Sequence, residues 1–349
     1  MIRVGVIGYG YWGPNIVRNF HGTDGFHVHT VCDKSPDSLQ RARKIYPALT
    51  FTQDVKDVLE STEIDVVAVI TPPWTHYELA KAALQNGKHV FVEKPFTWKS
   101  EQAEELIEIA ERRHLTIMVD HTFLFTGAVK KIREMVDENF LGDLYYYDSL
   151  RVNLGLFQHD VNVIWDLAPH DLSIMDHLIQ DKPEAIVATG ETHLNGHEDV
   201  AFITVYFPKN VIAHINVNWL SPVKVRTTLI GGEKKMLVWN DLEADEKIKI
   251  YDKGAKMQDP TNLHQLLVSY RSGDMWAPHV QEIEALKAEL TYFHECLSSN
   301  TNPFNDGAAG LRIVRMLEAA ELSVKNRGKT IYLQPGGASK RLMEVKRSA

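Results

Sequence analysis

The first third of the chain alternates short apolar runs with segments of helical period. Apolar runs without internal alternation are typical of strands buried on both faces, and regular strand–helix alternation favours a parallel, doubly wound sheet. We expect strands at residues 2–7, 27–32, 65–70, 88–92 and 115–119, and helices at 14–20, 76–86 and 100–113.

Beyond about residue 122 the hydrophobic pattern changes to period two. Residues 211–219 place Val, Ala, Ile, Val and Trp on one face and mainly polar side chains on the other, which predicts a mainly antiparallel sheet with one more polar face. Residues 252–278 are polar and irregular, and we expect a binding lid or a disordered excursion there. The other expected elements are helices at 126–139, 165–180, 279–298 and 307–326, and strands at 142–153, 184–191, 200–207, 225–231, 235–239 and 246–251.

A glycine-rich turn joins the first strand to the first helix. Gly8, Gly10 and Gly13 have the G-x-G-x-x-G spacing, and Tyr11 and Trp12 lie within it. The first glycine permits a tight turn, the second lets the backbone approach a pyrophosphate, and the third allows close helix packing. The helix N-terminus offers amide groups to the phosphates. We therefore expect this turn to bind a dinucleotide.

An acidic residue, Asp33, follows the second expected strand, twenty positions after Gly13. A carboxylate there can accept hydrogen bonds from a ribose diol, and it repels a 2′-phosphate, so the sequence favours NAD over NADP. Lys34, Arg41 and Arg43 lie nearby and weaken that preference, although we interpret them as part of a solvated helix face.

These patterns predict an α/β protein with two domains. The first is an N-terminal Rossmann domain with a doubly wound parallel sheet, at residues 1–121. The second, at residues 122–335, is a C-terminal α+β domain with a large, mainly antiparallel, open-faced sheet. A tail is expected at residues 336–349.

Composition narrows the functional classes. The 349 residues are 44% hydrophobic and 24% charged, which is ordinary for a globular protein. A net charge of −8 and a pI near 6.1 argue against nucleic acid or an anionic membrane as the main partner. Cys32 and Cys296 do not suggest a disulfide framework, and neither a signal peptide nor a membrane-spanning apolar run is found, so we expect a cytoplasmic protein.

The sequence Glu93-Lys94-Pro95 directly follows an apolar run. Proline offers no N–H to a sheet ladder, so the strand should end here. A carboxylate and an ammonium group then lie at the carboxyl end of a parallel strand, where doubly wound sheets bind ligands. Taken alone, the pair is better explained as a surface ion pair at a strand end, because such pairs are common.

The loop at residues 71–76 leaves the carboxyl end of the preceding strand. We expect it to cover the nicotinamide side of the dinucleotide through Thr71, Pro72 and His76. A surface position at the start of the next helix is an alternative for His76.

Asp166 and His170 form the second chemical candidate. At positions i and i+4 of a helix they share one face, and Pro169 between them is tolerable if the helix begins near residue 165. A histidine beside a carboxylate can take and give a proton near neutral pH. A helix-capping aspartate with a satisfied core histidine is the structural alternative.

Taken together, these stretches resemble the Gfo/Idh/MocA family of NAD(P)-dependent sugar and inositol oxidoreductases, from Val4 to about Thr330. The resemblance implies that Lys94 is the catalytic lysine and that Asp166 and His170 are the catalytic pair. It also implies that the second domain binds substrate and serves oligomerisation. The chain departs from many members after the last Rossmann strand, where it has Asp120-His-Thr-Phe123 instead of an Arg-Phe type element.

A narrower similarity joins the chain to members of nucleotide-sugar and surface-polysaccharide pathways. It rests on residues 151–160, 165–171 and 270–274. The reaction that it implies is oxidation of a ring secondary alcohol, best assigned to C-3 of a UDP-N-acetylhexosamine or its uronate. The expected substrate contacts are Lys94, Arg151, Asn153, Asn162, Asp166 and His170, and the expected cofactor contacts include Glu93 and Lys94.

Three other functions remain open. An inositol or free-sugar dehydrogenase would use the same chemistry. A glycosidase that uses bound NAD transiently would release an aglycone and no net NADH. The third is a non-catalytic sensor of NAD and sugar. The presence of Lys94, Asp166 and His170 argues against it, because a sensor needs no proton relay. No metal site is predicted. We expect a homodimer or homotetramer, because the face that bears Phe202, Tyr206 and Ile212 is too apolar to be fully exposed to solvent.

Overall fold

A computed structural model describes residues 1–155, 161–194, 196–257 and 268–333. The chain divides into two compact units. The first holds residues 1–125 and 283–315, and the second holds residues 126–282 and continues from Met316. Residues 283–315 thus group with the N-terminal part of the chain, whereas the sequence predicted a single boundary near residue 121. The roles assigned to the two parts remain predictions.

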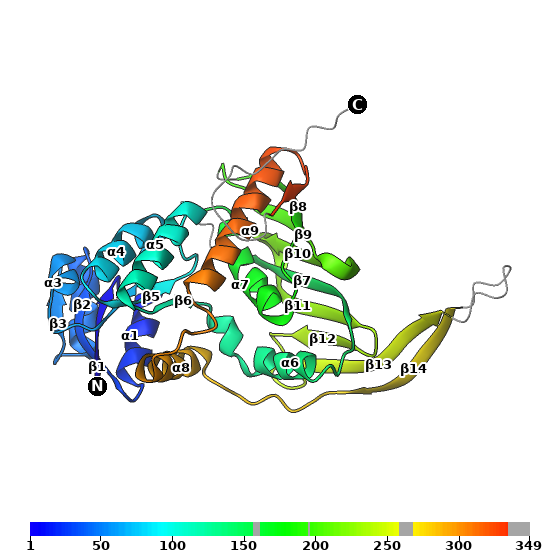
Figure 1. The fold of residues 1–349 in the computed structure, drawn as a ribbon, viewed down its shortest axis with the longest axis horizontal. Coiled ribbons are helices and arrows are strands. Elements are labelled where there is room, and N and C mark those ends of the chain that lie inside the picture. Colours follow the sequence, from blue (N-terminus) through cyan, green and yellow to red (C-terminus); the bar gives the residue numbers. More distant parts are fainter. Residues whose placement is uncertain (156–160, 195, 258–267, 334–349) are drawn as a thin grey trace. The chain divides into compact units, whose positions relative to one another are not determined.

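The first unit contains a six-stranded parallel sheet in the order β3-β2-β1-β4-β5-β6 (Figure 1). This order confirms the predicted doubly wound sheet, because it reverses between β1 and β4, the point at which such sheets bind ligands at the carboxyl ends of their strands. The strands are β1 (Ile2–Ile7), β2 (Phe26–Cys32), β3 (Thr50–Thr52), β4 (Val66–Val69), β5 (His89–Glu93) and β6 (Ile117–Asp120).

Helices between these strands bury their apolar stripes on the sheet. In α1, for example, Ile16, Val17 and Phe20 are fully buried. The aromatic ring of Phe293 in α8 packs against Phe91 with ring centroids 5.8 Å apart, which ties this late helix to the first unit. The helices are α1 (Gly13–His21), α2 (Pro36–Ile45), α3 (Lys56–Leu59), α4 (Pro73–Gln85), α5 (Ser100–Arg113), the 3-10 turn η1 (Thr122–Phe125) and α8 (Ala285–Ser299). Helix α9 (Gly307–Lys325) begins in this unit and ends in the second.

The second unit is built on a nine-stranded sheet in the order β14-β13-β12-β11-β7-β10-β9-β8-β15. Neighbouring strands are antiparallel except β7 and β10, so the predicted mainly antiparallel sheet is confirmed. The strands are β7 (Leu144–Leu154), β8 (Ala185–Glu191), β9 (Val200–Tyr206), β10 (Ile212–Asn218), β11 (Leu220–Gly232), β12 (Met236–Asn240), β13 (Ile248–Met257), β14 (Val268–Trp276) and β15 (Ile331–Tyr332).

One face of this sheet carries the helices α6 (Gly127–Asp137) and α7 (Val163–Leu178), with α7 on β7, β9 and β10. Ala213, Ile215 and Val217 of β10 are fully buried on that face, as the period-two pattern predicted. The opposite face is open: Phe202, Tyr206 and Ile212 are 41%, 42% and 40% exposed. The short 3-10 turn η2 (Pro208–Asn210) joins β9 to β10.

The expectation of irregular chain at residues 252–278 is wrong. Residues 252–257 continue β13, and residues 268–276 form β14, which pairs with it to make a long hairpin (Figure 1). Pairing between strands overrides the polar local sequence, because each polar residue contributes its backbone to the ladder. Residues 258–267 lie outside the described part of the chain. In that part, no helix has the length and apolarity needed to cross a bilayer.

Candidate functional site

The glycine turn between β1 and α1 fits the phosphates of a dinucleotide. Gly8 has φ +106°, and a Cβ added there would lie 2.1 Å from the carbonyl oxygen of Ile70. A Cβ at Gly13 would lie 2.5 Å from the carbonyl oxygen of Gly8, whereas one at Gly10 would meet no described atom within 4 Å. The turn is thus closed at its first and third glycines and open at its second. No described side chain caps the N-terminus of α1. The N–H groups of Asn15 and Ile16 donate to the carbonyl of Trp12 and Pro14 has no N–H, so an anion would rely mainly on the backbone of the turn itself.

Asp33 lies at the end of β2 and faces back to this turn. Its Oδ2 accepts the backbone N–H of Tyr9 over 2.6 Å, and its Oδ1 accepts the N–H of Ser35 over 2.7 Å. Each carboxylate oxygen has a second lone pair, so these bonds leave acceptor capacity for a ribose diol. The contact of Asp33 with a ribose stays a prediction.

The two aromatic residues of the turn behave differently. The side chain of Tyr11 is 88% exposed. The indole N–H of Trp12 donates to Oδ2 of Asp120, at the end of β6, over 3.3 Å. Trp12 therefore joins the glycine turn to the far edge of the parallel sheet.

His76 is fully buried in α4, so the alternative of a surface position is wrong. Its Nδ1 lies 2.8 Å from the carbonyl oxygen of Pro95, and its Nε2 lies 2.7 Å from that of Thr71. Burial lowers the pKa of His76. The imidazole thus lies between two turns, one after β4 and one after β5, and while neutral it donates to only one of the two carbonyls. Pro72, which precedes α4, lies in the first of them.

The Glu93-Lys94-Pro95 turn follows β5, at the carboxyl edge of the sheet. Glu93 is paired in register with Asp120 of β6. Burial and the neighbouring Asp120 raise the pKa of Glu93 well above the usual value of a glutamate. Lys94 is half-buried, and its bond to Pro95 is cis.

Asp166 and His170 lie on α7, both half-buried, one turn apart. The helix begins at Val163 rather than near residue 165. The indole N–H of Trp219, a fully buried residue between β10 and β11, donates to Oδ2 of Asp166 over 3.1 Å. The carboxylate beside His170 is therefore held by the sheet below the helix.

Arg151 is only 5% exposed and forms a buried ion pair with Asp171. Its Nε donates to Oδ2 over 2.6 Å, and Nη2 donates to Oδ1 over 3.2 Å. The hydroxyl of Ser149, two residues earlier on β7, donates to the same carboxylate over 2.7 Å. This arrangement gives Arg151 a structural role that the sequence did not predict, and its contact with a substrate stays a prediction.

Two asparagines complete the predicted set. Asn162 is the N-cap of α7: its Oδ1 accepts the N–H of Trp165 over 3.0 Å, and its Nδ2 donates to Glu198 over 2.8 Å. Asn153 is half-buried near the end of β7. Both remain substrate-contact predictions.

Sequence reasoning missed two buried residues, Glu289 and Trp219. Glu289 had a local signal, because it shares the buried stripe of Leu286, Leu290 and Phe293 on α8, where a charge is out of place. Trp219 had none, because its partner Asp166 is 53 residues away.

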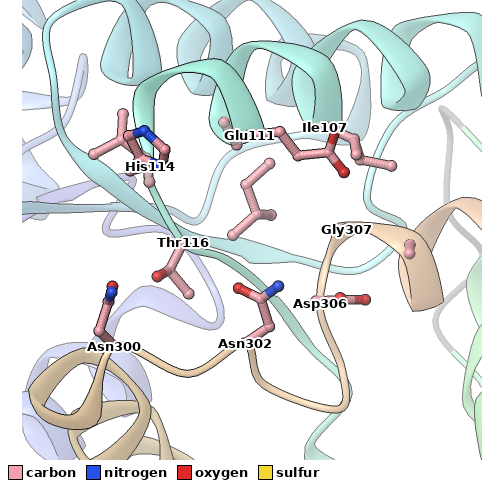
Figure 2. A pocket seen from close by; sticks show the side chains of 12 residues that line it. Ile107, Glu111, His114, Thr116, Asn300, Asn302, Asp306 and Gly307 are labelled. Carbon is pink, nitrogen blue, oxygen red and sulfur yellow. The ribbon is translucent and has the colours of Figure 1, made fainter.

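The described residues contain no group of three or more histidine, cysteine, aspartate or glutamate side chains arranged to hold a metal ion. A hollow of about 320 Å³ lies between the end of α5 and the loop before α9 (Figure 2). Glu111, His114, Thr116, Asn300 and Asn302 give it a polar lining. It lies at the amino end of β6, the opposite end from the predicted cofactor residues, and none of them lines it.

Two family models match the chain. One, described as an oxidoreductase family with an NAD-binding Rossmann fold, matches residues 2–121. The other, the GFO/IDH/MocA C-terminal domain, matches residues 129–238. The first match includes the glycine turn and the Glu93-Lys94-Pro95 turn, and the second includes α7.

Several known proteins are similar to this chain, two of those described here over most of their length. The UDP-N-acetylglucosamine 3-dehydrogenase of Acidithiobacillus ferrooxidans is 26% identical over 333 residues, 93% of this chain and 96% of the relative. Its solved structure superposes with a TM-score of 0.77 over 93% of this chain and 98% of that one, at 24% identity. The NADP-dependent scyllo-inositol 2-dehydrogenase of Bacillus subtilis is 23% identical over 95% of this chain and 96% of its own. A glycosyl hydrolase family 109 protein of Shewanella amazonensis is 27% identical over 44% of this chain and 35% of its own.

Proposed function

Because the chain belongs to the GFO/IDH/MocA oxidoreductase family, we propose that it is an NAD-dependent dehydrogenase of a ring secondary alcohol, at C-3 of a nucleotide sugar. The sugar that we favour is a UDP-N-acetylhexosamine or its uronate. Similarity to the UDP-N-acetylglucosamine 3-dehydrogenase over nearly the full length of both chains supports this substrate class.

The observation that carries the proposal is the arrangement on α7. Removing a hydride from a carbon requires the hydroxyl on that carbon to lose its proton, so a base is needed. His170 takes this proton. Asp166 orients the imidazole and stabilises its charged form, and Trp219 fixes Asp166 by the indole hydrogen bond of 3.1 Å.

Lys94 supplies charge rather than basicity. Its ammonium group binds the reacting oxygen and stabilises the negative charge that develops there. An ordinary lysine is a poor base at neutral pH, which is why we assign the proton transfer to His170. Arg151, Asn153 and Asn162 are proposed as further substrate contacts.

The nucleotide-binding residues fit NAD. The open position at Gly10 and the uncapped start of α1 suit the pyrophosphate, and Asp33 suits an unphosphorylated ribose. Tyr11, Thr71, Pro72 and Glu93 are proposed to line the same cofactor. NAD supplies a hydride acceptor when bound.

A second candidate has a specific observation in its favour. The partial match to a glycosyl hydrolase family 109 protein supports cleavage of a glycosidic bond, in place of net oxidation, as the rival reaction. Such an enzyme would release an aglycone and accumulate no NADH. The scyllo-inositol dehydrogenase match likewise supports a cyclitol or free sugar as the rival substrate.

One screen separates these functions. The purified protein is incubated with NAD and a panel of UDP-sugars, free sugars and inositols, while NADH absorbance and product masses are followed. We expect NADH to form with a UDP-N-acetylhexosamine or its uronate, together with a product two hydrogens lighter. NADH formed only with inositols or free sugars rejects the nucleotide sugar, and aglycone release without NADH rejects the dehydrogenase.

A further inference from the structure

Three carboxyl side chains are buried together in the first unit. Glu93 ends β5 and Asp120 ends β6, directly opposite each other in register. Glu289 reaches them from α8. Asp120 is 2% exposed and Glu289 is fully buried. The cluster lies at the carboxyl edge of the parallel sheet, one residue from Lys94.

Protons are needed to stabilise the contacts within this cluster. Asp120 lies beside Glu93, its partner in register, and next to Glu289, all three in buried or half-buried positions. Ionised carboxylates only accept, so a hydrogen bond between two carboxyl groups exists only if one of them carries a proton. In addition, Oε2 of Glu93 and of Glu289 receives no hydrogen bond from the described chain, as expected for oxygens that face another carboxyl group.

Asp120 also connects the cluster to the glycine turn. It accepts the indole N–H of Trp12 over 3.3 Å and the hydroxyl of Thr122. On the other side, Asn305 donates to Oε1 of Glu289 over 2.9 Å and to the carbonyl of Val119 over 2.8 Å. The carboxyl groups thus form a continuous connection from α8 to the dinucleotide turn.

The surrounding charges do not neutralise three carboxylates. The pKa of Glu289 is raised well above its usual value, mainly by burial and next by the neighbouring Asp120. Glu93 raises it further. Lys94 opposes the rise at Glu93, and the backbone N–H of His121 opposes it at Glu289. These opposing contacts are outweighed, which agrees with the burial of the carboxyl groups and with the two buried Oε2 atoms that receive no hydrogen bond from the described chain.

We propose that Glu289 is a proton-carrying positioning residue, which through Asp120 holds Trp12 of the glycine turn and the end of the strand that carries Lys94. This inference rests on the proposed NAD-dependent function. When the cluster releases a proton to solvent at high pH, two acceptors face each other and repel. The anchor of Trp12 then weakens, and NAD affinity falls with it.

The first test detects the proton itself. Infrared spectra of the full-length protein are recorded from pH 5 to pH 9. We expect the band of a protonated carboxylic acid to persist at pH 7 in the wild type and to lose intensity in Glu289→Gln. Glu295→Gln, which removes an exposed carboxylate from the same helix, should keep the band. Absence of the band in the wild type at pH 7 overturns the proposal without reference to any variant.

The second test measures NAD affinity by calorimetry over the same pH range. Once the pH exceeds the value at which the cluster loses its proton, we expect the wild-type Kd for NAD to rise about tenfold with each further pH unit. Glu289→Gln, which keeps a donor but cannot ionise, should remove this dependence. Glu289→Leu should weaken NAD at every pH. If Glu289→Leu binds NAD as the wild type does, the positioning role is wrong.

Neither test needs turnover. Protein that binds NAD with this pH dependence but oxidises none of the sugars disproves the proposed substrate and leaves the carboxyl network standing. Protein that oxidises a nucleotide sugar but lacks the infrared band supports the proposed substrate and disproves the carboxyl network.

Discussion

Trp219 donates its indole N–H to Oδ2 of Asp166 over 3.1 Å, so the carboxylate one turn before His170 is held by a residue of the sheet. An aspartate that oriented His170 without such support would itself be free to rotate. A buried indole has one donor and two stiff side-chain torsions, which makes it a rigid support.

Replacing His170 should therefore remove the base and leave the rest of α7 in place. We expect His170→Asn to lower turnover by about 10² to 10⁴. NAD affinity should stay nearly unchanged, because the glycine turn and Asp33 lie in the other unit. Steady-state kinetics over pH should also lose the acid limb of the rate profile, since that limb reports protonation of the base.

Lys94→Met serves as the comparison for His170→Asn. It should also abolish most turnover but should keep the acid limb in whatever activity remains. Near-normal turnover with an unchanged acid limb in His170→Asn would make this histidine structural.

Asp33 should set the choice of dinucleotide. Asp33→Ala is expected to weaken NAD more than NADP, because it removes the ribose acceptor and the repulsion of a 2′-phosphate together. Calorimetric titration of both dinucleotides measures this. Asp37→Ala, an exposed acid on the next helix, should change neither affinity. Tighter binding of NADP than of NAD by the unaltered protein would contradict the assignment.

His76 should support the turns that follow β4 and β5. His76→Phe keeps a ring but removes the donor to a buried carbonyl, which we expect to cost about 1–3 kcal/mol of stability. Burial lowers the pKa of His76, so the unfolded chain binds more protons, and the stability present above the unfolded value of 6.5 is lost as pH falls. Denaturant unfolding at pH 5 and pH 8 should show less acid sensitivity in His76→Phe than in the wild type.

His27→Phe, which changes an exposed histidine of the same unit, is the control for His76→Phe. It should leave stability nearly unchanged at both pH values. Equal losses in the two variants would mean that the hydrogen bonds of His76 contribute nothing.

Breaking the pair between Arg151 and Asp171 should unfold the second unit more readily. Arg151→Met leaves a carboxylate buried without its cation, which costs about 3–5 kcal/mol. Chemical denaturation measures the loss. Lys131→Met removes the cation of an exposed pair with Glu134 and should cost at most about 1 kcal/mol. If Arg151→Met loses as little stability as Lys131→Met, Asp171 is not a buried charge that needs Arg151.

The open face of the second sheet should be an interface between copies of the chain. Phe202, Tyr206 and Ile212 leave an apolar patch there, and packing against another copy would cover it. We expect light scattering to report a homodimer or homotetramer, and Phe202→Glu to shift it towards monomer. Ile45→Glu, at an exposed apolar position of the first unit, should not. A monomeric wild type at micromolar concentration would refute the prediction.

The sequence predicted what local patterns encode. Continuous apolar runs marked the buried strands, and the period of residues 211–219 marked both faces of β10. It failed where structure depends on distant partners. Thr50–Thr52 is too short to show a period, and β14 has a polar sequence that becomes a strand only against β13, where Arg271 pairs with Asp252. The same limit explains why the residues that carry the candidate chemistry could be proposed while Trp219, whose partner Asp166 is 53 residues away, could not.

The chain enters the first unit twice, at residues 1–125 and again at 283–315. A fragment that ends at residue 125 therefore lacks α8, and with it the ring of Phe293 that packs on Phe26 and Phe91. It would also lack Glu289. The first unit is consequently not encoded by one continuous segment, and a single recombination crossover could not transfer it whole to another protein, because α8 follows strands β7 to β14 of the second unit in the sequence.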